Sequence, residues 1–448
     1  MKKFNVKSLI IPALAAILSL AVIFASACSP SCSIYASTLD WAVAMIEEFY
    51  YEDVSEEDVR AAGLENLSGN VLDIYSRYYT AEEYEQTNSS NEGNRSGIGV
   101  SYSYLSPELN LSMGSGVYIA SVLGNSPAWR SGLRPGTFVT GARTAQGEEV
   151  AIADNDDFAA FINARAEGEQ FTLITDRGEF SMAKENYVMS YCRMATAEGE
   201  WSISYDADGD MSADYVQSDR YSYLPEGTAY VSLSQFYGNA SEEMAALFKV
   251  FNQEGCTSLI LDLRNNGGGY VSIMQELTYL FTAELDEAYD VAMYARFKDG
   301  SATSYEVDAF TSDSSSYIPA GTQVTILANN GTASASEALI GALVANGVAG
   351  YDDIYVSDFS DTYLAATGTE DKDCRTYGKG IMQSTWQYWV TGEALKLTVA
   401  QIYWPDGQMS IHDRGVGVSD GCHTVPAEWS VTYADEELQA VCAMLAAY

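Results

Sequence analysis

An apolar run, a group of small residues and a second apolar run follow one another between residues 324 and 344. The first run, 324–327, is β-branched and aliphatic, which favours a strand; the second, 338–344, repeats its apolar residues at helical spacing. The heptad between them, residues 331–337, reads Gly-Thr-Ala-Ser-Ala-Ser-Glu. This order predicts a strand, a tight turn and a helix, and such a turn can present a serine hydroxyl beside the first free amides of the helix. From the heptad alone, an Asn-Gly turn followed by a serine cap is the simpler interpretation, so a catalytic role needs partner residues elsewhere in the chain.

Two further stretches accompany the heptad. Residues 259–263 form a buried-strand pattern that runs into Asp-Leu-Arg-Asn-Asn-Gly-Gly-Gly at 262–269, and Tyr-Gly-Lys-Gly-Ile-Met-Gln at 377–383 opens a late strand. Together with the heptad, these stretches resemble the C-terminal processing peptidases, a family of PDZ-bearing serine proteases that use a Ser/Lys pair. The resemblance covers roughly residue 39 to the C-terminus.

Charge excludes some classes of partner. The 448 residues include 62 acidic and 23 basic side chains, a formal net charge of −39, so nucleic acid and anionic membrane surfaces would be repelled. With 47% hydrophobic and 19% charged residues, the chain is long enough for two or three cored domains.

The N-terminus has the pattern of a targeting segment. Lys2, Lys3 and Lys7 precede an apolar stretch at 9–24 and the small residues at 25–27, which predicts an exported protein with a signal peptide at 1–27. Cys28 then stands where a bacterial lipoprotein carries its lipid, so we expect an outward-facing cell-membrane lipoprotein. Simple secretion and an uncleaved anchor helix are the alternatives.

The expected fold is α/β and multidomain: an N-terminal helical segment, a PDZ-like β domain, and a protease core with a βαβ-type sheet plus a C-terminal β-rich part. The predicted boundaries are 28–94 for the helical segment with a polar linker at 87–96, 95–185 for the PDZ domain, and 186–448 for the core. Helices are expected at 39–50, with a second, capped by Ser55 and Asp58, through 67.

The PDZ-like pattern begins at Gly97-Ile98-Gly99-Val100 and continues with a helix at 157–165 and a strand at 171–175. By resemblance, the loop formed by Gly97, Ile98, Gly99 and Val100 would hold the terminal carboxylate of a peptide that adds to the sheet as an extra strand. A glycine-rich turn in an unrelated small β domain is the alternative.

Other ligand patterns are incomplete, so no metal or cofactor is expected. The acidic run at 206–210 lacks the glycine and glutamate of a calcium loop and is better interpreted as a hairpin turn. The glycine run at 267–269 lacks the lysine of a phosphate-binding loop. If Cys28 is lipidated, six cysteines remain and allow 15 pairings, and buried free thiols are the simpler expectation.

A serine nucleophile needs a base. His412 and His423 are the only histidines, and a neutral lysine is the other candidate if its surroundings lower its pKa. Lys379 is best placed, because Gly378 and Gly380 let the chain pass close to another element. In a strand, Gln383 would share its face and orient the amine without adding charge.

The resemblance implies a role for each residue. Ser334 would be the nucleophile, preferred to Ser336 because Ala-Ser-Glu follows it, with Lys379 as general base and Gln383 as its orienter. The amide of Ala335 would supply one oxyanion donor, and the glycine loop, through Gly268, the other.

The spacing departs from the family pattern. Lys379 lies 45 residues after Ser334, which predicts an insertion near 350–376 that folds away or acts as a lid. Lys372 and Lys396 are alternative bases. Residues 394–403 and 408–411 are expected to form a hairpin.

The predicted function is that of a serine endopeptidase that cleaves proteins or peptides near free C-termini through a Ser334 acyl-enzyme. The alternative is an inactive, membrane-tethered PDZ scaffold that only binds peptides. Oligomeric state and physiological substrate do not follow from the sequence.

Overall fold

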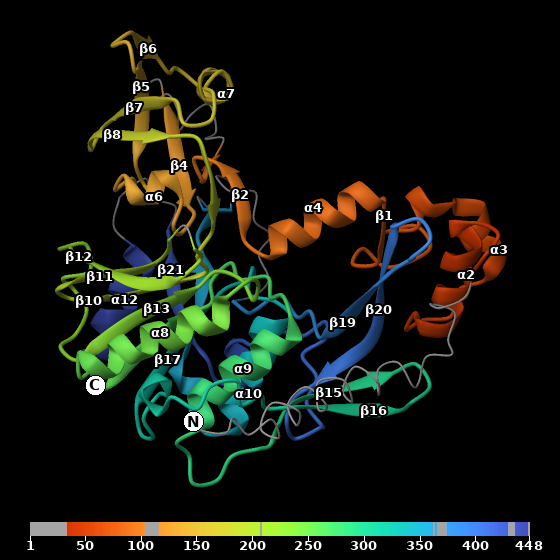
Figure 1. Cartoon of the computed structure of the whole chain (residues 1–448). Coiled ribbons are helices and arrows are strands. Elements are labelled where there is room, and N and C mark those ends of the chain that lie inside the picture. The colour runs from red at the N-terminus through yellow and green to blue at the C-terminus, as the bar shows by residue number, and fades with distance from the viewer. Residues whose placement is uncertain are drawn as a thin grey trace, which may run out of the picture. The chain divides into compact units, whose positions relative to one another are not determined.

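The computed structural model describes residues 34–103, 116–206, 208–361, 363–364, 374–428 and 435–446. The chain divides into two compact units, the first made of residues 1–88, 296–302 and 381–401 and the second of the remainder (Figure 1). The predicted signal peptide, Cys28 and Lys372 lie outside the described residues. Within the described residues, no helix is long and apolar enough to span a bilayer.

The first unit contains short helices and an antiparallel sheet. Ser55 accepts a hydrogen bond from the amide of Asp58, which confirms the predicted cap, and Trp41 stacks on Tyr388 with ring centroids 5.1 Å apart. Strand β20 pairs with β1 on one side and with β19 on the other. The elements are α2 (Thr38–Phe49), α3 (Glu56–Ala62), η3 (Leu64–Asn66), β1 (Arg77–Tyr79), β19 (Ile381–Gln387) and β20 (Ala394–Tyr403).

Residues 87–96 do not form the expected linker. Helix α4 (Ala81–Asn91) occupies the first part, and β2 (Asn94–Gly97) follows and pairs with β9 (Glu185–Val188). The polar composition that suggested a linker is that of an exposed helix, because α4 has no buried residue.

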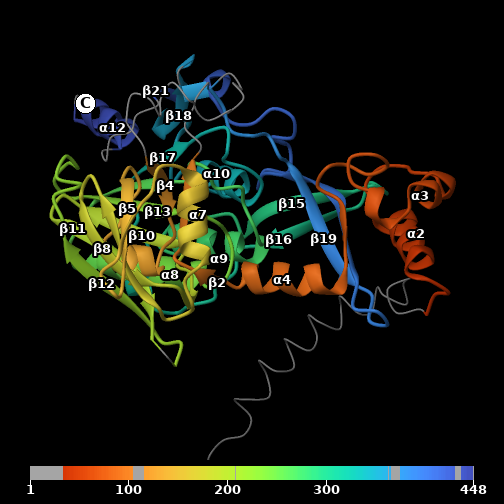
Figure 2. The same cartoon turned by 90° about the horizontal axis from the view of Figure 1, so that it is seen from above.

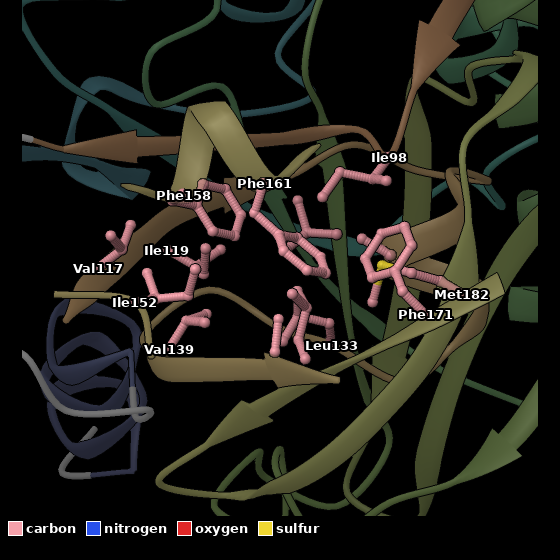
Figure 3. Packing of buried hydrophobic residues seen from close by; sticks show 14 of the residues in the cluster. Ile98, Val117, Ile119, Leu133, Val139, Ile152, Phe158, Phe161, Phe171 and Met182 are labelled. Atoms are coloured by element: carbon pink, nitrogen blue, oxygen red, sulfur yellow. The ribbon is translucent and has the colours of Figure 1, made fainter. Parts of the chain in front are cut away.

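The PDZ-like domain is a mainly antiparallel sheet in the order β3-β4-β5-β7-β8, with β6 paired to β5. Its core brings together apolar side chains from the sheet and both helices, among them Ile119, Phe158 and Phe171 (Figure 3). The elements are β3 (Val100–Ser103), β4 (Val117–Val122), α6 (Pro127–Arg130), β5 (Phe138–Thr144), β6 (Glu149–Ala151), α7 (Asn155–Asn163), β7 (Gln170–Thr175) and β8 (Gly178–Ala183).

The core domain is built on a sheet in the order β12-β11-β10-β13-β14-β17-β18-β21. Strands β12 to β13 are antiparallel and the five from β13 to β21 are parallel, which confirms the βαβ expectation. The strands are β10 (Cys192–Thr196), β11 (Gly199–Tyr205), β12 (Met211–Gln217), β13 (Thr228–Leu233), β14 (Ser258–Asp262), β17 (Gln323–Ala328), β18 (Ile354–Phe359) and β21 (His423–Ala427).

Helices cover both faces of this sheet. Alternate residues of neighbouring strands, such as Tyr230, Ile260 and Leu327, pack against Leu438 and Val441 of α12. Helices α8 and α9 lie across the opposite face, as both views show (Figures 1 and 2). The remaining elements are α8 (Ala240–Gln253), α9 (Val271–Thr282), β15 (Val291–Phe297), β16 (Ala302–Glu306), η4 (Ser314–Ser316), α10 (Ala335–Ala345), η5 (Tyr351–Asp353), η6 (Val418–Asp420) and α12 (Glu436–Leu445).

Two expectations about the C-terminal half need correction. The expected insertion at 350–376 contributes a core strand, because β18 lies between β17 and β21 and buries Ile354 and Val356. The expected hairpin partner at 408–411 is not a strand. The carboxylate of Asp406 accepts the amides of Gln408 and Met409 in a local turn, no strand follows it directly, and β20 pairs with β19.

The hairpin predicted around 206–210 is confirmed by the pairing of β11 with β12. No cluster of metal-binding side chains occurs among the described residues. Cys192, Cys256, Cys422 and Cys442 are buried free thiols, and Cys374 is half-buried.

Glu243 of α8 binds the backbone at the start of β10, the first strand of the core domain. Its fully buried carboxylate accepts the amides of Tyr191 and Cys192, at 2.7 and 2.8 Å, and the hydroxyl of Tyr205. Burial raises the pKa of Glu243 to about 7, although these hydrogen bonds oppose the change.

This pKa predicts a pH-dependent stability. Between roughly pH 4.5 and 7 the native protein keeps a proton that the unfolded chain has lost, so the contribution of Glu243 to stability falls as pH rises through that window. The free energy of unfolding should drop by an amount on the order of 3 kcal/mol relative to Glu243→Gln, which cannot titrate. Melting temperatures of both proteins from pH 4.5 to 8 check this. Glu242→Gln changes an exposed neighbour, so its melting temperature should depend on pH as that of the wild type does. If the melting temperature of Glu243→Gln showed the same pH dependence as the wild type, the prediction would be contradicted.

Candidate active site

Ser334 lies at the sharp turn between β17 and α10. It is the residue before the helix begins at Ala335, and its φ of 60° is unusual for a residue other than glycine. A backbone held in this region costs about 1–3 kcal/mol and persists only where its surroundings impose it. The half-buried Ser334 is thus presented at the carboxyl end of a parallel strand, as nucleophilic serines on strand-to-helix turns are.

The loop before Ser334 is tied to the neighbouring loop after β14. The side-chain oxygen of Asn329 accepts the amides of Asn265 and Gly331, both at 2.9 Å. The hydroxyl of Thr332 donates to the carbonyl of Leu263 at 2.8 Å. The heptad and the Asn-Asn-Gly-Gly-Gly stretch therefore form one hydrogen-bonded unit, although more than 60 residues separate them in the chain.

Ser336 has a structural role. Its hydroxyl is fully buried and donates to the carbonyl of Asn266 at 2.9 Å, and the same carbonyl accepts the amide of Ala333. The partly exposed Ser334 is therefore the better placed of the two serines to meet a substrate.

Glu337 holds the turn and the Lys379 segment together. One carboxylate oxygen accepts from the hydroxyl of Thr376 at 2.5 Å and the amide of Gly378 at 2.8 Å. The other accepts the amides of Lys379 at 2.9 Å and Ser334 at 3.0 Å. The backbone nitrogens of Ser334 and Lys379 share one acceptor atom, so they cannot be more than about 6 Å apart.

Replacement of Glu337 should therefore damage activity more than stability. Burial raises the pKa of Glu337, against the effect of its four donors. In Glu337→Gln an NH₂ group replaces one acceptor oxygen and faces donors, so the paired segments should separate slightly. A displacement of 1 Å at reacting groups can lower the rate by about 100-fold. We expect peptide cleavage to fall about 10- to 100-fold with the fold retained, measured as kcat/KM beside a melting curve. Activity equal to that of the wild type would contradict this role.

Gly268 lies directly behind Ser334. A side chain at Gly268, whose φ is +94°, would come within 2.8 Å of the Ser334 Cβ and of the Ala335 nitrogen. The Gly268 amide donates to the side-chain oxygen of Asn266 at 2.9 Å, so it must exchange that bond before it can serve an oxyanion. Ala335 is the first residue of α10, where amides have no acceptor within the helix.

Lys379 lies in a loop just before β19, and its backbone is fixed by Glu337. The close approach expected from its flanking glycines is confirmed: a Cβ at Gly378 would meet the Gly415 nitrogen at 2.9 Å, and one at Gly380 the His412 nitrogen at 2.6 Å. Lys379 is half-buried.

Gln383 and Lys396 belong to the first unit. Gln383 lies on β19 and its amide donates to the hydroxyl of Thr398 at 3.1 Å. The side chains of residues 379, 381 and 383 do not alternate as they would in one regular strand. Strand β19 begins only at Ile381, and its register with β20 shifts between Met382 and Gln383. Lys396 lies on β20, where burial lowers its pKa.

The histidines lie on separate elements. His423 is on β21 and packs against the ring of Tyr355 at 5.1 Å between centroids. His412 is half-buried in the loop before Asp413, with 3.6 Å between its Nε2 and the Asp413 carboxylate.

The predicted carboxylate loop spans the end of β2, residues 98 and 99, and the start of β3. Ile98 is buried in the PDZ-like core, and its carbonyl accepts the amide of Ala128 of α6. The carbonyl of Gly99 accepts the amide of Leu123. The loop of Gly97, Ile98, Gly99 and Val100 is therefore anchored through its carbonyls to the segment around α6.

Sequence reasoning missed Glu337 and Thr376 as site residues. The pattern Ser-x-x-Glu at the start of a helix is a capping-box signal and could have pointed to Glu337. Thr376 carries no comparable signal, because its contact with Glu337 depends on how two distant segments meet.

Comparison with known proteins shows what the chain is similar to. Residues 227–350 match the family model described as Peptidase family S41. The chain is 23% identical over 379 residues to a "Probable CtpA-like serine protease" of Staphylococcus epidermidis (strain ATCC 12228 / FDA PCI 1200), covering 84% of this chain and 63% of the relative. A protein of the same name from Staphylococcus aureus (strain bovine RF122 / ET3-1) is 23% identical over 368 residues, covering 82% and 60%.

The chain thus spans about three fifths of the length of these curated relatives. Among solved structures, the "Putative S41 protease" from Bacteroides fragilis NCTC 9343 has the same fold, with a TM-score of 0.57, 13% identity, and coverage of 93% of this chain and 98% of that one. The resemblance inferred from the three motifs is confirmed.

Proposed function

We propose that this chain, whose residues 227–350 match peptidase family S41, is an exported serine endopeptidase that cleaves peptide bonds near the C-termini of its substrates. Ser334 would attack the scissile carbonyl and form an acyl-enzyme. The names of the relatives, the site geometry and the motif order all support this proposal.

In the proposed mechanism, the uncharged amine of Lys379 takes the proton from the Ser334 hydroxyl as the Oγ–C bond forms. The amide of Ala335 and a glycine-loop amide would stabilise the oxyanion. The lysine proton then passes to the leaving amine as the C–N bond breaks. Water, deprotonated by the same lysine, then forms a bond to the acyl carbon; the Oγ–C bond breaks, and the lysine returns its proton to the Ser334 oxygen. Gln383 would orient the lysine.

The observation that carries the proposal is the shared acceptor at Glu337. A single buried carboxylate oxygen accepts both the Ser334 and the Lys379 amides. A scaffold that only binds peptides would not need this arrangement. It holds the backbone nitrogens of a strained serine and a glycine-flanked lysine within about 6 Å of each other.

Substrates would be extended or unfolded chains with free C-termini, captured by strand addition at the loop of Gly97, Ile98, Gly99 and Val100. We further propose export with residues 1–27 removed and a lipid on Cys28, which would hold the enzyme on the outer face of the cell membrane. The proposed mechanism requires no cofactor, metal or nucleic acid.

The competing function is a tethered scaffold that binds C-terminal peptides without cleaving them. Incubation of the purified chain with an unstructured protein and with a fluorophosphonate, followed by mass spectrometry, separates the two. Cleavage, together with the label on Ser334, supports the peptidase. Peptide binding with neither cleavage nor label would establish the scaffold.

Peptides of one sequence with a C-terminal carboxylate or a C-terminal amide test the capture mode. Faster cleavage of the carboxylate form supports capture of free C-termini, and equal rates would refute it.

A further inference from the structure

Arg264 is surrounded by carboxylates at the carboxyl end of β14. Its guanidinium forms two hydrogen bonds to Asp262, at 2.7 and 3.0 Å, and two to Asp435, at 2.7 and 3.2 Å. A further bond of 3.1 Å reaches Glu437. Only 12% of the Arg264 side chain is exposed.

The carboxylates are themselves held by the fold. Asp262 accepts the hydroxyl of Tyr230 at 2.6 Å, and Glu437 accepts the hydroxyl of Ser357 of β18. Asp435 caps α12 by accepting the amide of Leu438 at 3.0 Å. Burial works against ionisation of Asp435, but the Arg264 guanidinium lowers its pKa overall. One arginine thus links the first turn of the C-terminal helix to the end of β14.

Such a cluster is a poor source of net stability. Taking one guanidinium and three carboxylates out of water is costly, and apolar replacements of buried ion pairs are often neutral or stabilising. Its geometry, in contrast, is well defined, because a planar guanidinium can form paired bonds to two carboxylates at once.

What the cluster restrains is the loop that contacts the nucleophile. Arg264 is followed by Asn265, whose φ is 59°, and then by Asn266, whose carbonyl accepts the amide of Ala333. The side chain of Asn266 also accepts the amide of Gly268. Arg264 is therefore two residues from the atoms that set the position of Ser334.

A cavity of about 690 Å³ lies beside this loop and is lined by Arg264, Asn265 and Asn329 among others. On that side Asn265 is exposed, so its backbone has less packing against it than a buried segment has. The hydrogen bonds from Arg264 to the first turn of α12 can restrain the loop backbone there.

We propose that Arg264 is a positioning residue, which the first turn of α12 holds in place so that the loop 265–269 keeps Ser334 and its oxyanion donors in reacting geometry. This inference rests on the proposed peptidase function. It assigns to the C-terminal helix a part in catalysis through Arg264 and not through contact with substrate.

Arg264→Lys tests it, because lysine keeps the charge and loses the paired geometry. We expect kcat to fall about 10- to 100-fold, the effect of a small displacement of reacting groups, while KM stays within about threefold. The inhibition constant of a peptidyl boronic acid, which bonds to Ser334 and mimics the tetrahedral intermediate, should rise by a similar factor. The affinity of an uncleaved peptide, measured in a Ser334→Ala background, should not change.

Two further variants make the result decisive. Glu437→Gln removes one charged partner of Arg264 and leaves its paired bonds to Asp262 and Asp435. It should therefore cause a smaller loss of kcat and of boronate inhibition. If Arg264→Lys does not fold, this variant provides the test. Arg143→Lys is the matched control, since Arg143 bridges Glu149 and Glu179 on the exposed PDZ-like sheet, and it should have wild-type kcat and boronate inhibition.

Unchanged kcat and boronate inhibition in folded Arg264→Lys and Glu437→Gln would overturn the positioning role. So would a rise in KM alone, or a loss of activity explained by a lower melting temperature. The peptidase function is judged separately, by whether the wild type cleaves and whether the label reaches Ser334.

Discussion

Ser334→Ala is expected to lower the rate of peptide cleavage by roughly 10⁴-fold or more, since removal of a nucleophilic serine has effects of that size in serine proteases. The fold should survive, because the strained turn is held through backbone contacts, among them the bond from the Ser334 amide to Glu337. Cleavage of an unstructured protein, followed by gel and by mass spectrometry, measures the loss. Labelling by a fluorophosphonate should disappear in parallel.

Ser336→Ala is the matched control. It removes a buried bond to the carbonyl of Asn266, so we expect lower stability and some loss of rate with the label still on Ser334. If Ser334→Ala retained the activity and the label while Ser336→Ala lost them, the nucleophile would be misassigned.

Lys379→Met is the second large effect that we expect. Methionine keeps most of the unbranched stem and removes only the amine that would take the serine proton. General-base catalysis contributes about 10²- to 10⁴-fold, so kcat should fall by that amount with little change in peptide affinity. The bond from the amide of residue 379 to Glu337 is a backbone bond and should remain, so the melting temperature should stay close to that of the wild type. Rates under single-turnover conditions measure the chemical step directly.

Lys396→Met and Lys372→Met test the alternative bases. Burial lowers the pKa of Lys396, and a lysine that acts as a base needs a lowered pKa. Lys396 is therefore a realistic competitor for this role. If Lys396→Met or Lys372→Met abolished cleavage while Lys379→Met did not, the base would lie elsewhere. His412→Ala and His423→Ala should remain active, because neither imidazole is required in the proposed mechanism.

Local sequence patterns were enough to predict most of the strands and helices that position the site. The β-branched run at 324–327 lies in β17 and the apolar repeat at 338–344 lies in α10, because strand and helix periods differ and each can be recognised over a short window. The glycines beside Lys379 also indicated a close approach, which the structure confirms. The same local reasoning failed at 408–411, where the Asp406 carboxylate accepts the amides of Gln408 and Met409 and no strand forms.

Residues that act across the fold were not predictable in this way. Glu337 was visible in the heptad, but its bonds to Thr376, Gly378 and Lys379 arise only when a segment about 40 residues later returns to the helix start. The strand at 354–359 was interpreted as part of an insertion, because its place between β17 and β21 depends on pairings that no local pattern encodes.

The sequence by itself determined which stretches carry the reactive serine, the glycine loop and the lysine, since these depend on residue type and near-neighbour spacing. Only the tertiary structure decided that Glu337 joins the serine and lysine backbones and that Arg264 joins the glycine loop to the last helix. The physical reason is that such bonds form between segments far apart in the chain. Their partners are selected by how the parallel strands order themselves and pack, and not by the residues on either side.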